Sequence, residues 1–133
     1  MRCFIYYNLH KHCLSVRALS GPDKGRVIAH ANALLLESAI FRVSEAGRQR
    51  VLRERSKNVH AGMVGELTMY AKLDDAPDAK LQQLYASAIA LQVPVITYNP
   101  YQDASFVVLP ERVPIQTASR VLAVGKQVFA LPD

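Results

Sequence analysis

Short runs of apolar, β-branched and aromatic residues, each followed within a few positions by Gly, Pro, Asn or Asp, occupy most of this chain. This pattern is typical of β-strands joined by tight turns, and only one stretch repeats its apolar residues at helical spacing. At 133 residues the chain is long enough to bury one hydrophobic core, so we expect a single domain over residues 1–133. The pattern predicts an α+β fold, in which one amphipathic helix packs on a mostly antiparallel sheet arranged as a meander or an open barrel.

About nine short strands are expected from these runs. Residues 3–9 and 13–19 are predicted to form a first hairpin, and residues 119–124 and 127–131 a last one. The loop at residues 20–25 contains Gly25, which can take a positive φ. The remaining strands are expected at 27–37 (with a break near Asn32), 40–44, 48–55, 59–67, 95–98 and 105–109.

The helix is expected to lie between Asp74-Asp75 and Pro94. Carboxylates favour the positive end of the helix dipole, Pro77 suits the first turn, and Pro94 disfavours helical geometry at the residue before it. One apolar stripe with helical spacing runs through Leu81, Leu84, Tyr85, Ala88 and Ile89. We expect this stripe to cover one face of the sheet.

Positive charge is concentrated in residues 42–57, which we call the arginine-rich segment. It holds six basic and two acidic side chains, an excess of +4, while the whole chain carries +5. Arginine offers planar, bidentate donors that match phosphate and carboxylate groups, and several arginines together attract a polyanion. The sequence therefore predicts an anionic partner.

We predict that residues 48–60 form a basic β-hairpin that binds the phosphates of a nucleotide or a nucleic acid, and that the protein is not an enzyme. The residues predicted to bind the ligand are Arg48, Arg50, Arg53, Arg55, Lys57, Asn58 and His60. Secondary candidates are Arg42, Tyr98, Asn99 and Tyr101. Two glycines, Gly62 and Gly65, are expected to leave room beside His60 for a ligand or for a neighbouring backbone.

Other interpretations of the arginine-rich segment stay open. The arginines can protect an exposed strand edge, dock on an acidic face of another protein, or assist His60 in a small phosphohydrolase or nuclease. Residues 48–55 contain no aromatic side chain to stack on bases, which weighs against a single-strand binder. An exposed ribbon is also compatible with a homo-oligomer that pairs across a two-fold axis.

The sequence predicts no metal and no cofactor. It contains no phosphate-binding glycine motif or nucleophile motif, and Cys3, His10, His12 and Cys13 do not have the spacing of zinc ligands. The two cysteines are expected to be buried thiols rather than a disulfide. There is no run of about 18 apolar residues and no signal-peptide pattern, so we expect a cytoplasmic protein that does not enter a membrane.

Four phrases of the sequence, YYNLHKHCLSVRA, GRVIAHA, GRQRVLRERSKNVHAGMVG and VITYNPYQDASFV, together resemble a family of small proteins encoded by bacterial viruses. The resemblance runs from about Tyr6 to Phe106, and its most specific part is the arginine-rich phrase. It assigns no catalytic role to any residue. It implies a phage accessory protein in the cytoplasm of the infected host, where such proteins often inhibit host machinery or defence systems.

Overall fold

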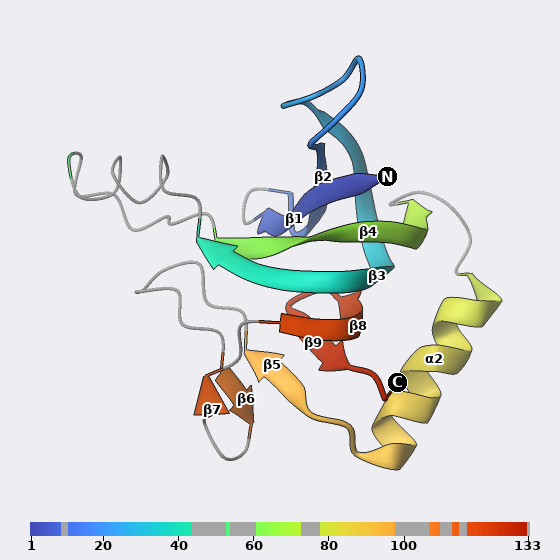
Figure 1. Ribbon diagram of the computed structural model, residues 1–133. Helices are drawn as coiled ribbons and strands as arrows, with labels where there is room; N and C mark the ends of the chain where they lie inside the picture. Colours follow the sequence, from blue (N-terminus) through green and yellow to red (C-terminus); the bar gives the residue numbers. More distant parts are fainter. Residues whose placement is uncertain are drawn as a thin grey trace.

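The computed structural model describes residues 1–8, 11–43, 53, 61–72, 78–97, 107–109, 113–114 and 117–132. In this part of the chain nine strands form one sheet, every strand pair is antiparallel, and the helix α2 (Ala79–Leu91) packs against the sheet (Figure 1). The predicted α+β class, with a mostly antiparallel sheet and one helix packed on it, is therefore confirmed.

The strands follow the order β2-β1-β4-β3-β8-β9-β5-β6-β7 across the sheet. Because β2 also pairs with β3, the strands β2, β1, β4 and β3 form a closed ring. This order is not that of a simple meander, since β4 lies between β1 and β3. The bounds are β1 (Arg2–Asn8), β2 (Cys13–Ala18), β3 (Val27–Val43), β4 (Ala61–Lys72), β5 (Val95–Thr97), β6 (Val107–Leu109), β7 (Val113–Pro114), β8 (Thr117–Val124) and β9 (Gln127–Ala130).

The strand β3 covers both of the strands that the sequence predicts at 27–37 and 40–44. The prediction of two separate strands is therefore wrong. Ser38 takes a φ of 51°, and the register with β4 shifts between Glu37 and Ile40. A bulge of this kind changes the phase of the apolar pattern, as a turn does, without taking the chain out of the sheet. The break expected near Asn32 is present as a second register shift, between Ala31 and Ala33.

Two hydrophobic clusters lie on opposite faces of the sheet. Leu34 and Leu36 belong to one cluster and Leu35 to the other, and all three leucines are buried because both faces of β3 are covered. The first cluster is lined by β1, β2, β3, β4, β8 and β9, and includes Ile5, Val16, Met63, Val121 and Val128. The second joins the sheet to α2 through Leu35, Leu81, Ala88, Leu122 and Phe129.

The helix begins later than predicted. Asp78 is its N-cap, and the side chain of Asp78 accepts a hydrogen bond from the backbone N–H of Leu81 at 3.0 Å. The roles predicted for Asp74, Asp75 and Pro77 at the start of the helix fall outside the described residues. The helix ends at Leu91 and is followed by Gln92 in the left-handed conformation, ahead of Pro94 as predicted. Within the described ranges, no helix has the length and apolar character needed to cross a membrane.

Cys3 and Cys13 are free thiols with 0% and 1% of their surface exposed, as predicted. The register separates them, since Cys3 faces Ala18 and Cys13 faces Asn8. Burial raises the pKa of both thiols. The positive N-terminal amine near Cys3 and the ammonium of Lys11 near Cys13 oppose this rise in pKa without cancelling it.

The space beside the two glycines of β4 is filled by neighbouring strands. A Cβ atom on Gly65 would lie 2.7 Å from the carbonyl oxygen of Glu37 and 2.8 Å from Cγ of Leu36. A Cβ atom on Gly62 would lie 2.7 Å from Cζ of Phe4 and would also meet the carbonyl oxygen of Ile5. The glycines thus allow close contact between strands, so the room expected at these two positions is taken by a neighbouring backbone and not by a ligand.

We expect Gly65→Ala to destabilise the protein by about 1–3 kcal/mol, because the added methyl group overlaps a backbone oxygen that cannot move without breaking the sheet. If no atom occupied this space, the same substitution would stabilise the protein by about 0.4–1 kcal/mol, because alanine lowers the conformational entropy of the unfolded chain. The sign of the change in unfolding free energy therefore tells whether the space is filled. Urea unfolding measures it, with Ser119→Ala on an exposed position of β8 as the control. A variant as stable as the parent would contradict the described packing.

The raised thiol pKa values predict a loss of stability in alkali. The folded state holds the thiol protons more tightly than the unfolded state, so this stabilisation is complete below the unfolded pKa and is lost as pH rises through the folded pKa, above about pH 9. Each unit of pKa elevation contributes about 1.4 kcal/mol. The unfolding free energy should fall less between pH 7.5 and pH 10 in a Cys3→Ala, Cys13→Ala double variant than in the parent protein. An equal fall in both proteins would show that the thiols do not cause the loss of stability.

Candidate functional site

Most of the predicted ligand-binding residues lie outside the described residues, namely Arg48, Arg50, Arg55, Lys57, Asn58, His60, Tyr98, Asn99 and Tyr101. Two of them are described. Arg53 is exposed and its backbone is helical, so the prediction of a strand over 48–55 is wrong at this residue. Arg42 lies near the end of β3, where it pairs with Gly62 of β4.

The sheet fixes the two residues that flank positions 44–60, which include most of the arginine-rich segment. Val43 pairs with Ala61, so residues 44–60 connect the end of β3 to the start of the adjacent strand β4. The next strand is β1, whose Tyr6 pairs with Gly62. Figure 1 shows the ends of β3 and β1 and the start of β4 on the same side of the molecule. The last residues of β1 therefore lie beside the point at which the arginine-rich segment rejoins the sheet.

The register aligns a row of residues across these strands. Gly62 lies opposite Tyr6, Tyr6 opposite Ser15, and Ser15 opposite His30. In the adjacent row Phe4 lies opposite Arg17. Residues directly opposite each other in antiparallel strands share a face, so the two rows lie on one face of these strands, and Tyr6 also packs against the cluster of Ile5 and Val16.

An arginine lies over two aromatic rings on this face. The guanidinium carbon of Arg17 is 5.9 Å from the ring centre of Phe4 and 5.8 Å from that of Tyr6, within the range of cation–π attraction. The two rings are 6.0 Å apart and tilted by 33°. Phe4 is buried against Gly62, while Tyr6 and Arg17 are partly exposed. The Nε atom of Arg17 is buried and has no hydrogen-bond partner among the described residues.

A chain of hydrogen bonds holds Lys11 and His30 next to β2, the strand that contains Arg17. Asn8 donates through Nδ2 to the hydroxyl of Ser15 at 3.2 Å, and its Oδ1 accepts from the backbone N–H of Lys11 at 3.0 Å. Ser15 Oγ lies 3.2 Å from Nδ1 of His30, and Nε2 of His30 lies 3.4 Å from the ammonium of Lys11. An ammonium only donates, so in the contact between Lys11 and His30 the ring nitrogen Nε2 is the acceptor.

This Ser–His pair does not have the arrangement of a nucleophile and its base. Ser15 is fully buried, whereas a nucleophile has to be accessible to its substrate. The pair positions Lys11, whose side chain is exposed.

Among the described residues, no group of three or more His, Cys, Asp and Glu side chains could hold a metal ion. The chemistry available here is the binding of a negative group. We call Phe4, Tyr6, Lys11, Arg17 and His30 the aromatic–basic cluster.

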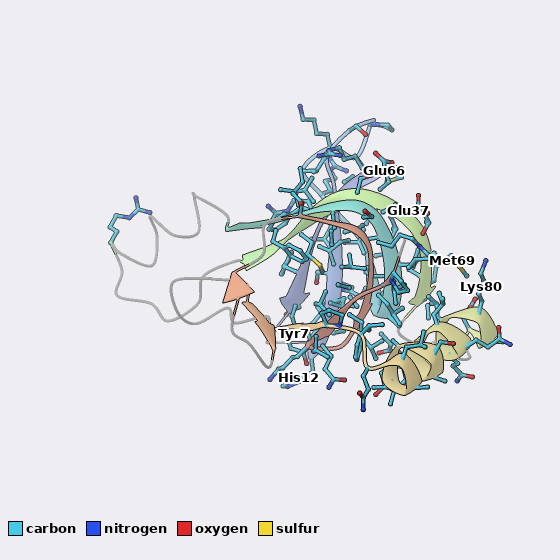
Figure 2. All side chains as sticks on the ribbon, turned by 60° about the horizontal axis from the view of Figure 1, so that its bottom comes forward. Tyr7, His12, Glu37, Glu66, Met69 and Lys80 are labelled. Atoms are coloured by element: carbon cyan, nitrogen blue, oxygen red, sulfur yellow. The ribbon has the colours of Figure 1, made fainter. Side chains whose placement is uncertain are left out.

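Acidic side chains lie away from the turn that holds Lys11 but not from Arg17, since Glu66 is opposite Arg2, two positions along β1 from the pair of Phe4 and Arg17. Figure 2 shows Glu37 and Glu66 together at one end and Tyr7 and His12 at the other. The N-terminal amine forms an ion pair with Glu66 at 3.1 Å, whereas no carboxylate of the described part lies within 4 Å of the Lys11 or Arg17 side chains. Lys126 adds another positive charge near Tyr7, since its Nζ lies 5.4 Å from the centre of that ring.

A cavity of about 200 Å³ between α2 and the sheet is a weaker candidate site. It is smaller than the roughly 300–1,000 Å³ of typical ligand pockets. Its walls are formed by Asn32, Ala33, Ala71, Asp78, Leu81, Gln82, Tyr85 and Val124, and the carboxylate of Asp78 already caps the helix.

The sequence prediction did not include Arg17 or His30 as site residues. Tyr6 and Arg17 are partly exposed on strands whose other residues are mostly buried, and the sequence of the first predicted hairpin gives no clear signal that sets them apart. Their position beside the arginine-rich segment depends on the pairing of β1 with β4, which separates partners by more than 50 positions in the chain. Periodicity within one strand carries no information about such a distant partner.

Comparison with known proteins supports the resemblance to phage proteins. The family model of the Mycobacterium phage L5 gene 82 protein matches residues 1–131. The gene 82 protein of Mycobacterium phage L5 is 40% identical over 127 residues, covering 91% of this chain and 88% of that protein. No solved structure matches the chain. Because the match extends over nearly the whole sequence, the chain belongs to the family of the Mycobacterium phage L5 gene 82 protein.

Proposed function

We propose that this phage protein is a non-enzymatic accessory protein that binds the phosphate groups of a nucleotide or nucleic acid through its arginine-rich segment. The observation that carries the proposal is the concentration of charge, six basic against two acidic side chains within residues 42–57. Guanidinium groups match phosphate oxygens in geometry as well as charge, so a cluster of them is suited to bind phosphate groups.

The surroundings of the segment support this function. Arg53 is exposed, Lys11 lies on the turn that follows β1, and Arg17 lies over the ring of Tyr6, whose partner Gly62 is near the start of β4. A positive surface without nearby carboxylates raises the local concentration of a polyanion and speeds its association. The edge-protection alternative accounts less well for this arrangement, because Lys11 and Arg17 lie on strands and turns within the closed ring and not on an edge.

The biological role belongs to the same proposal. A member of a phage family acts in the cytoplasm of the infected bacterium, and a protein that occupies phosphate ligands there inhibits a host or defence system that uses them. An acidic face of a host protein offers carboxylates in place of phosphates, so it is the competing partner.

Binding of a labelled oligonucleotide and of a labelled nucleoside triphosphate should be measured by fluorescence anisotropy from about 50 to 200 mM salt. We expect the affinity to fall steeply with salt, because each phosphate contact releases counterions. Replacement of Arg48, Arg50, Arg53 and Arg55 by Gln should lower the slope of log affinity against log salt by about one for each lost contact.

The matched control is Arg26→Gln, which removes an exposed arginine outside the segment and should leave the slope unchanged. Binding that does not respond to salt, or a slope equal in the four-arginine variant and the parent, would refute the proposal. A host protein that is captured by the purified chain after nuclease treatment, and released by the four-arginine variant, would replace it with the acidic-protein partner.

A further inference from the structure

We propose that the ligand is a single-stranded nucleic acid whose bases stack on the aromatic–basic cluster while its phosphates contact the surrounding cations. This inference rests on the proposed function, since it names which phosphate ligand is bound. The aromatic side chains that residues 48–55 lack are supplied by β1, which the fold places beside the start of β4.

The cluster offers a stacking surface of the kind that single-strand binders use. Tyr6 is partly exposed and shares its face with the guanidinium of Arg17, 5.8 Å from the ring centre. Both a tyrosine ring and a guanidinium plane stack on unpaired bases. Phe4 is buried below them against Gly62, so it supports the surface and does not itself contact a base.

Arg17 carries the strongest indication of a missing ligand group. Its Nε atom is buried without a hydrogen-bond partner among the described residues, and its charge has no carboxylate beside it in that part of the chain. A buried donor without an acceptor costs free energy, and cation–π contact with two rings offsets only part of that cost. Because Nε itself is buried, a bound strand would meet the exposed part of the Arg17 side chain, and its phosphates would supply the negative charge.

The arrangement favours an unpaired strand over a duplex or a free nucleotide. In a duplex the faces of the bases are covered by their neighbours, so a ring on a sheet face reaches only the backbone. A free nucleotide brings its phosphates to one point, whereas the cations here are spread over the turn after β1, where Lys11 is exposed, and β2, where Arg17 is partly exposed. Such a spread matches successive phosphates along one strand.

The test compares an oligothymidylate of about 20 nucleotides with its oligoadenylate duplex and with a nucleoside triphosphate. We expect the single strand to bind most tightly. Tyr6→Leu should weaken single-strand binding about tenfold while the salt slope stays constant, because stacking does not release counterions. Tyr6→Phe should bind like the parent, since the ring and not the hydroxyl makes the contact.

Tyr70→Leu is the matched control, because Tyr70 is an exposed tyrosine elsewhere on β4, 40% of whose surface is accessible. Arg17→Lys keeps the charge and removes the planar group, so it should weaken single-strand binding with little change in slope, whereas Arg26→Lys should have no effect. As a readout independent of variant stability, a strand carrying 5-iodouracil should photocrosslink to Tyr6 in the parent protein.

The outcomes separate this inference from the proposed function. Three results together would overturn the single-strand inference and leave the proposal of phosphate binding intact. These are equal, salt-dependent binding of duplex and single strand, no effect of Tyr6→Leu, and no crosslink on Tyr6. Salt-dependent binding to the triphosphate alone would overturn it in favour of a nucleotide. Absence of salt-dependent binding to all three probes would overturn both.

Discussion

The 17-residue strand β3 is the element on which the rest of the structure depends. One of its edges pairs with β4, and the other pairs first with β2 and then with β8. The pairing with β2 closes the ring of four strands, and the pairing with β8 extends the sheet toward β9 and the surface that α2 covers. Where a strand has neighbours on both edges and cover on both faces its side chains must be apolar, which explains why Leu34, Leu35 and Leu36 follow one another in the middle of β3.

The same closure determines the position of the candidate site. Because β4 returns beside both β3 and β1, the two ends of the arginine-rich segment leave the sheet next to the last residues of β1. The glycines of β4 let these strands approach closely, and Phe4 occupies the space above Gly62. Tyr6 and Arg17 are thereby held on the face beside the segment, with Lys11 positioned through Asn8 and His30. Stacking groups and cations that are distant in the chain become neighbours on one surface.

The fold class, the first and last hairpins and the helix were predictable because they depend on local spacing. Alternation along one strand and helical periodicity are properties of consecutive residues, and Pro94 acts on the residue before it. The merged strand β3 was not predicted, because a bulge and a turn produce the same change of phase at Ser38. The helix start was misplaced since three aspartates, Asp74, Asp75 and Asp78, are equally good caps by residue type, and only the hydrogen bond to Leu81 selects Asp78.

The sequence by itself determined that this protein carries a mid-chain excess of arginine, buried thiols and a β-rich fold with one helix, because charge and local periodicity are fixed by residue order. Tertiary structure alone decided which side chains accompany the arginine-rich segment. The register of β1 against β4 joins Tyr6 to Gly62, and the register of β1 against β2 joins Phe4 to Arg17. Long-range pairing of this kind is set by the burial of a whole face and not by any local pattern, so the aromatic–basic cluster exists only in the folded chain.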